Sequence, residues 1–270
     1  MTPLFGVDFT SAPRRAKPIT VAHGRLTPEG VRLEALESMA DWPAFEALLK
    51  RPGPWLGAFD FPFGLPREGV CSMGWPDRSW ATLVRHVAGL DKAAFRAALD
   101  ADRMARPMGA RYPHRHTDAA ARSHSPMKLV NPPVGLMFFE GAPRLLEAGV
   151  SIPGVHDGDP ARIAVEAYPG LLARALTLQS YKSDTRSRQN AARADARAQI
   201  LAALDTGTAL PGLALGITPQ QRAMVLADGS GDLLDATLAL VQAAWCAQRR
   251  HAAFGCPADA DPLEGWIATA

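Results

Sequence analysis

The first third of the chain is built from short apolar runs separated by polar turns. Residues 3–11, 18–26 and 30–36 are rich in aliphatic and β-branched side chains, and the turn-forming segment TPEG joins the second run to the third. Short connections of this kind favour antiparallel pairing. The pattern therefore predicts three successive strands in one sheet.

A helix and a fourth strand are predicted next. The segment DWPAFEALLKR at 41–51 has the periodicity of a helix, with Asp41 suited to the N-cap and Pro43 to the first turn. The segment PWLGAFDFPFGLP at 54–66 predicts a strand that ends in a proline-rich turn.

Residues 67–160 show little regular alternation of apolar and polar positions, and clear patterns return only after them. Residues 67–160 combine a helical piece at 91–103 with stretches rich in Pro, His and Arg, and we expect an irregular or helical insertion there. Residues 161–170 predict a fifth strand. Helices are predicted at 171–176, 186–204, 218–227 and 232–250.

The last of these helices has the clearest boundaries. Ser230 or Gly231 suits its N-cap, and the basic pair Arg249 and Arg250 suits the negative pole of the helix dipole at its other end. The element order predicts a single α/β domain over residues 1–270, with a mixed sheet flanked by helices and the 67–160 insertion inside it.

Composition narrows the class of protein. The chain has 270 residues, 47% of them apolar, which suffices for a substantial core. No apolar run approaches the roughly 18 residues of a membrane span, and no basic segment followed by an apolar run marks a secretion signal. Cys71, Cys246 and Cys256 have no CxxC spacing, which favours a reducing cytoplasm and no thiolate zinc site.

Three predicted strands carry an acidic residue near their carboxyl ends. Asp8 lies in GVDFTSAP, Asp60 in FDFPFGLP and Glu166 in VEAYPG. In open α/β sheets, ligands bind at this edge, close to the point where the strand order reverses. The three carboxylates therefore mark a candidate site.

The helix predicted at 232–250 adds two more carboxylates. Asp232 and Asp235 are three residues apart and share a face. A stripe of small residues lies almost in line with them: Ala236, Ala239 and Ala243. Larger apolar residues occupy the opposite stripe, so we expect a helix buried on both sides, close to the sheet, with its aspartates facing protein.

Clustered carboxylates repel one another and lose hydration when they are buried, and a divalent cation reverses that cost. Each residue alone has a structural explanation: Asp8 and Asp60 as turn caps, Asp232 and Asp235 as residues suited to a helix start, Glu166 as the partner of an arginine. Taken together, they predict a site for Mg²⁺ or Mn²⁺, the kind of site that catalyses phosphodiester cleavage.

The same segments resemble a known family. GVDFTSAP, FDFPFGLP, VEAYPGLL with the later YKSD, and DLLDATLAL are similar to the family called domain of unknown function 429, predicted nucleases with a ribonuclease H-like fold. The resemblance spans nearly the whole chain, more loosely over 67–160. It implies a five-stranded sheet of order 3-2-1-4-5, with a large insertion between strands four and five and with Asp8 beside Asp60.

The resemblance also implies roles for residues. Asp8, Asp60 and Asp235 would be metal ligands, with Asp232 as an added ligand. Glu166 is a further candidate catalytic residue, although it lies on the fifth strand, where the better-studied nucleases do not usually place a core ligand. Lys182 in YKSD is suited to reach a scissile phosphate.

Two segments are strongly basic. Residues 103–128 hold six Lys or Arg against one acidic residue, and residues 174–197 hold six against two. Such patches follow phosphate backbones, and Arg111, Arg115 and Arg186 are the substrate contacts they suggest. The alternative is a solvated surface with ordinary ion pairs. The histidines of YPHRHTD, His114 and His116, suggest either a second metal or acid–base site or a polar loop.

These features favour a cytoplasmic, divalent-metal-dependent phosphodiester hydrolase acting on DNA or RNA. Two alternatives remain open. A non-catalytic domain could bind nucleic acid or protein through its basic patches. A phosphotransferase of the actin-like and sugar-kinase type shares the β-β-β-α-β core, but the expected glycine-rich turn is absent where Asp8 is followed by Phe-Thr-Ser. Oligomeric state is not indicated.

Overall fold

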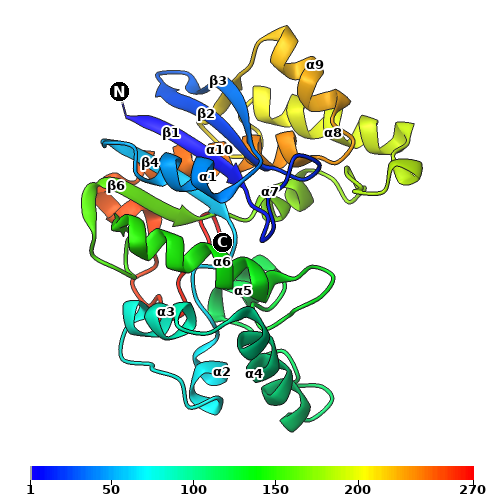
Figure 1. Cartoon of the computed structure of the whole chain (residues 1–270). Helices are drawn as coiled ribbons and strands as arrows, with labels where there is room; N and C mark the ends of the chain where they lie inside the picture. The colour runs from blue at the N-terminus through cyan, green and yellow to red at the C-terminus, as the bar shows by residue number, and fades with distance from the viewer. Residues whose placement is uncertain (1) are drawn as a thin grey trace.

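A computed structural model of the chain describes residues 2–270 as a mixed sheet between two layers of helices (Figure 1). The strands, in chain order, are β1 Pro3–Asp8, β2 Ile19–Thr27, β3 Gly30–Met39, β4 Trp55–Asp60, β5 Val150–Ser151, β6 Asp159–Glu166 and β7 Ala214–Gly216. They lie in the order β5-β6-β4-β1-β2-β3-β7. The pairs β1–β2 and β2–β3 are antiparallel, whereas β4 is parallel to both β1 and β6.

The predicted α/β class with a mixed, helix-flanked sheet is confirmed, but the predicted number of strands is wrong. The sheet has seven strands rather than five, because β5 and β7 extend its two edges. These strands have two and three residues. So few positions contain no alternation of apolar and polar side chains from which a strand is recognised.

Ten α-helices cover the sheet within residues 2–270. They are α1 Trp42–Leu49, α2 Arg67–Ser72, α3 Trp80–Ala88, α4 Lys92–Ala105, α5 His116–Ala121, α6 Val134–Ala148, α7 Pro169–Leu176, α8 Ala191–Asp205, α9 Pro219–Ala227 and α10 Asp232–Gln248. Asp41 caps α1 as predicted, accepting the Ala44 N–H at 3.0 Å. None of these helices is long and apolar enough to cross a bilayer.

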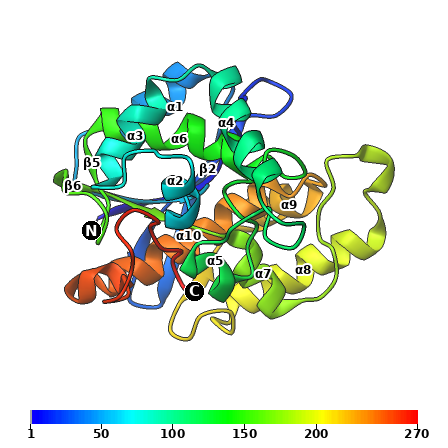
Figure 2. The same cartoon turned by 90° about the horizontal axis from the view of Figure 1, so that it is seen from below.

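Each face of the sheet has its own apolar core. Phe5, Val7 and Phe59 face the first core with α1 and the helices of the insertion, while Leu4 and Ala58 face the second with α7, α8 and α10. Figure 2 shows α1, α3, α4 and α6 on one side of the sheet and α7 to α10 on the other. Residues 67–160 are therefore more regular than expected and supply most of one helical layer.

Helix α10 lies directly against the sheet, in agreement with its alanine stripe. Gly6 in β1 allows this approach, because a Cβ atom there would lie 2.1 Å from both the Ala236 carbonyl oxygen and the Leu240 nitrogen. The absence of a side chain at Gly6 therefore sets the distance between β1 and the helix that begins with Asp232.

Replacing Gly6 with Ala is expected to destabilise the protein by about 3 kcal/mol or more, the upper end of overpacking costs, because the new methyl group meets backbone atoms that cannot rotate away. Urea unfolding would measure the loss. Gly109→Ala is the matched control, since nothing lies within 4 Å of its added Cβ. Equal stability of the two variants would contradict the close packing of α10 on β1.

Candidate active site

Asp8 and Asp60 are neighbours at the carboxyl ends of two parallel strands. The two residues are paired in the register of β1 and β4. Alternation along each strand turns both carboxylates to the face covered by α10, the side also occupied by Leu4 and Ala58. Asp8 is 8% exposed. Within residues 2–270, no hydrogen bond donor reaches either carboxylate.

The first turn of α10 brings two further carboxylates to the same place, each held by a lysine. Lys17 Nζ, from the loop between β1 and β2, lies 2.7 Å from Asp232 Oδ1 and 2.9 Å from Asp184 Oδ1. Asp235 is fully buried and accepts a hydrogen bond from the Tyr181 hydroxyl at 2.6 Å. Its other oxygen forms an ion pair with Lys182.

The charges of this group do not balance. Two ammonium groups face five carboxylates, because Lys17 contacts Asp184 as well as Asp232, and the two without a lysine partner are Asp8 and Asp60. Burial raises the pKa of Asp8 well above its usual value, and the charges of Asp235 and Asp232 raise it further. Burial and the charge of Asp235 likewise raise the pKa of Asp60 to about 7. The pair is thus in surroundings that favour either a proton or a cation.

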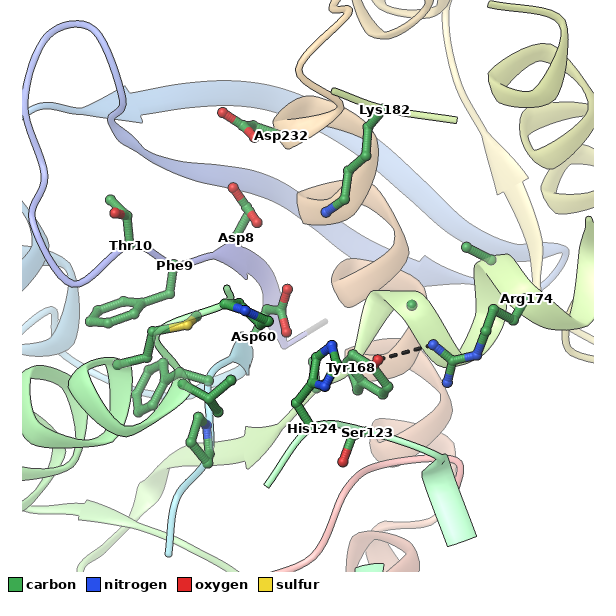
Figure 3. A pocket seen from close by; sticks show the side chains of 18 of the residues that line it. Asp8, Phe9, Thr10, Asp60, Ser123, His124, Tyr168, Arg174, Lys182 and Asp232 are labelled. Carbon is green, nitrogen blue, oxygen red and sulfur yellow. Dashed lines mark hydrogen bonds between the residues drawn. The ribbon is translucent and has the colours of Figure 1, made fainter. Parts of the chain in front are cut away.

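A cavity of about 770 Å³ opens over these groups. Asp8, Asp60, Asp232 and Lys182 line it, and Figure 3 shows them converging from β1, β4, α10 and the segment before α8. The remaining wall comes from the 67–160 insertion and from α7 with the residues that follow it. Glu166 and Arg115 also line it, so the structure brings six predicted site residues to one cavity. Asp235 is not in the lining and contacts the site through Lys182.

Glu166 is directed differently from the two strand aspartates. It aligns with Phe59 rather than Asp60 in the register of β6 and β4, so its side chain is on the opposite face of the sheet. Its carboxylate accepts hydrogen bonds from Arg115 Nη2 at 2.6 Å, Arg115 Nη1 at 2.8 Å and the Phe63 N–H at 2.8 Å. Glu166 is therefore the partner of a buried arginine, the structural alternative stated above. Its geometry gives no support to the predicted catalytic role.

Arg115 also has a structural role instead of the substrate contact that was predicted. Its guanidinium is 2% exposed and bonds to Asp118 as well as Glu166. A positive charge committed to two buried carboxylates is not free to bind a phosphate. Arg111 and Arg186 lie outside the cavity lining, and Arg186 is exposed in the 3₁₀ turn Arg186–Arg188.

The predicted four-aspartate metal set is only partly available. Among residues 2–270, no group of three or more His, Cys, Asp or Glu is arranged to hold a metal ion. The lysine partners of Asp232 and Asp235 explain this, because an ammonium group already occupies the space beside each carboxylate. His114 and His116 are exposed at the start of α5 and form no such group either. Oxygen donors suited to Mg²⁺ or Mn²⁺ are therefore free at Asp8 and Asp60.

Four residues of the site were not identified from the sequence: Lys17, His124, Arg174 and Tyr181. Tyr181 precedes Lys182 in YKSD, so that motif was the available signal. Lys17 lies in a turn with no pattern that ties it to α10, 215 residues away.

The cavity therefore combines two aspartates without a lysine partner, Asp8 buried and Asp60 partly buried, with two aspartates paired to lysines and a wall contributed by the insertion. Comparison of the chain with protein-family models, with curated proteins and with solved structures finds no match.

Proposed function

We propose that the protein is a divalent-metal-dependent phosphodiester hydrolase that acts on nucleic acid. The observation that carries the proposal is the pair Asp8 and Asp60, which lie side by side at the carboxyl ends of two central strands and face a cavity. No hydrogen bond donor from residues 2–270 reaches either carboxylate. Burying two carboxylates in this way costs stability, and binding a cation offsets that cost.

The strand order supports the ribonuclease H-like fold within this proposal. Strands β3, β2, β1, β4 and β6 are neighbours in that sequence, and β5 and β7 are additions at the two edges. This is the order that the resemblance to domain of unknown function 429 implies. The same resemblance suggests the nuclease class.

Asp8 and Asp60 would hold Mg²⁺ or Mn²⁺, with Asp232 available if Lys17 moves aside. A bound ion would supply an activated water and stabilise the charge of the leaving oxygen. Hydrolysis breaks one P–O ester bond, places the water oxygen on phosphorus and leaves a proton on the departing alcohol. Because Asp232 and Asp235 already have lysine partners, one divalent ion would balance the charges of Asp8 and Asp60.

Lys182 would orient the phosphate. Its ammonium group pairs with Asp235, and Figure 3 shows it directed toward the space beside Asp8 and Asp60. The Tyr181 hydroxyl donates to Asp235 and so helps to fix the carboxylate that pairs with Lys182. The lysine thus presents a positive charge close to the free carboxylates, where a negatively charged phosphate would approach.

The proposal is tested by incubating the purified protein with end-labelled single-stranded and duplex DNA and RNA, with Mg²⁺, with Mn²⁺ and with EDTA. We expect cleavage with either ion and none with EDTA. Equal product in all three conditions would point to a contaminating or metal-independent activity.

A pH prediction follows from Asp60. Its pKa of about 7 in the folded protein exceeds the ordinary value of 3.8, so between these values the folded state retains a proton that the unfolded state releases. The free energy of unfolding should therefore fall as pH rises from 3.8 to about 7 in EDTA. Melting temperatures at pH 5 and pH 8 would measure this, and Mg²⁺ at pH 8 should restore stability. Asp60→Asn should flatten the profile and weaken the Mg²⁺ effect, with the contribution of Asp8 remaining because its pKa is raised as well. A profile parallel to wild type would contradict the prediction.

A non-catalytic domain is the second candidate, favoured by the lysine partners of Asp232 and Asp235. In that case Asp8 and Asp60 would stay protonated and bind no ion. A thermal-shift titration separates the two functions, since Mg²⁺ or Mn²⁺ should raise the melting temperature only if the pair binds metal.

A further inference from the structure

The cavity has a second end that differs chemically from the aspartates. Arg174, at its rim, donates from Nη1 to the Tyr168 hydroxyl at 2.9 Å and from Nη2 to the Ala121 carbonyl at 2.6 Å, which fixes the guanidinium in place. His124 lines the same rim, and Figure 3 shows both residues on the side away from Asp232. Partial burial lowers the pKa of His124, and the positive charges of Lys128 and Arg174 lower it further, which favours the neutral imidazole. The positive charge of this rim therefore comes from Arg174, and His124 can contribute a neutral N–H donor.

Apolar side chains, some exposed and some partly buried, also line the cavity. Pro132, Pro133, Val134 and Met137, where α6 begins, line the cavity from the insertion. Leu178, which follows α7, lines it as well and is 98% exposed. Apolar groups left in water beside a polar site mark a surface for the apolar part of a ligand.

The size of the cavity limits what such a ligand can be. A volume of about 770 Å³ is within the range of small-molecule sites, roughly 300–1,000 Å³. A duplex would instead need a line of free cations along its backbone. Much of the basic charge of the chain is committed elsewhere: Arg106 pairs with Asp102 and Glu68, and Arg197 donates to backbone carbonyls.

Building on the proposed function, we infer that the cavity takes one unpaired nucleotide unit, with a phosphate at Arg174 and His124, the base against the apolar wall and the scissile ester at Asp8 and Asp60. The unit comes either from the end of a single strand, which supplies both groups, or from a free nucleotide, whose single phosphate occupies the Arg174 end and which brings no diester to Asp8 and Asp60. Paired nucleic acid is excluded, because its bases are stacked and hydrogen-bonded and are not free to enter the cavity.

Competition binding tests this inference without relying on cleavage. A fluorescent 20-nucleotide single strand is bound in EDTA and in Ca²⁺, and adenosine 5′-monophosphate, the unlabelled strand, the same strand closed into a circle and the blunt duplex are used as competitors. We expect the mononucleotide and the linear strand to compete at least about tenfold better than the circle or the duplex, a difference that corresponds to about 1.4 kcal/mol.

The relative affinities identify the source of the unit. A mononucleotide as effective as the linear strand indicates free nucleotides, and a stronger linear strand indicates chain ends. Competition by the circle or the duplex equal to that of the linear strand overturns the inference, and so does failure of the mononucleotide to compete.

Two variants locate the binding. Arg174→Ala should weaken it about tenfold through loss of a charged contact, and Leu178→Ala about fourfold, equivalent to one buried methylene. Arg78→Ala and Met224→Ala are matched controls, because both side chains are exposed and lie outside the cavity lining. Equal effects of variants and controls would move the nucleotide away from this cavity.

The outcomes separate this inference from the proposed hydrolase. Nucleotide binding without metal-dependent cleavage would leave the inference standing and remove the proposed activity. Cleavage of duplex or circular substrates at the rate of linear single strands would support the proposed activity and overturn the inference that one unpaired unit enters the cavity.

Discussion

Replacing Asp8 with Asn is expected to lower metal-dependent cleavage at least 100-fold, because even residues that only support metal ligands typically cost 10–100-fold when changed. Asn keeps the shape of the side chain but removes one of the two carboxylates that have no lysine partner. The rate is measured under single-turnover conditions with Mg²⁺ and with Mn²⁺.

The same substitution has a second expected result that does not depend on activity. Burial and the neighbouring aspartates disfavour the charged form of Asp8 and raise its pKa, so the neutral amide should make the metal-free protein more stable at pH 8. Stabilisation by Mg²⁺ should shrink at the same time. A loss of activity accompanied by higher stability without metal would distinguish a ligand from a residue needed for folding.

Asp195→Asn is the matched control, since Asp195 is exposed on α8 and lies outside the cavity lining. It should leave the cleavage rate, the melting temperature and the Mg²⁺ effect unchanged. An Asp8→Asn protein that cleaves at the wild-type rate would remove Asp8 from the mechanism and with it the proposed metal site.

The strand aspartates could be predicted because their signal is local. An acidic residue at the end of an apolar strand departs from the pattern around it, and both Asp8 and Asp60 do so. Glu166 carries the same signal but lies on the other face of the sheet. Which face a strand-end residue takes depends on its register against the neighbouring strand, and a shift of one residue reverses it.

Ionic partners could not be predicted because they join distant parts of the chain. Lys17 reaches Asp232 across 215 residues, and Arg106 reaches Glu68 across 38. Counting charges within a segment therefore overstated the positive charge free to meet a phosphate backbone. Arg115 is the clearest case, since its partner Glu166 is on a different element and was itself assigned a catalytic role.

The insertion was the least predictable part, for a related reason. Three of its helices have only six to nine residues, and α6 carries Pro143 in its interior, so their periodic pattern is short or interrupted. The helical piece predicted at 91–103 corresponds to α4. The apolar faces of the insertion's helices are completed only by the sheet: Trp80, Phe95 and Phe138 are buried in the same core as Phe5 and Phe59. The segment that was hardest to interpret thus covers one face of the sheet and forms a wall of the candidate site.

Replacing Arg115 with Ala should produce the largest loss of stability, about 3–5 kcal/mol, the usual result of removing one partner of a buried ion pair. The guanidinium bonds to Glu166, to Asp118 and, from Nη1, to the Glu264 carbonyl at 3.0 Å. Its loss leaves two carboxylates that are 3% and 1% exposed without their cation. Urea unfolding measures the effect. Arg25→Ala is the control, because its partner Glu34 is a surface residue and such pairs contribute at most about 1 kcal/mol.

The pH dependence of that loss distinguishes an uncompensated charge from a simple cavity. Burial already raises the pKa of Glu166 even with Arg115 beside it, and removing the arginine removes the main influence that lowers it. The folded variant would then hold a proton that the unfolded chain releases, so its stability should fall more steeply than that of wild type as pH rises from 5 to 8. Glu166→Gln in the Arg115→Ala background should recover part of the loss at pH 8 and little at pH 5. A loss equal at both pH values, with no recovery from Glu166→Gln, would contradict this. Arg115 would then stabilise the fold by filling space, and its positive charge would not be needed to keep Glu166 ionised.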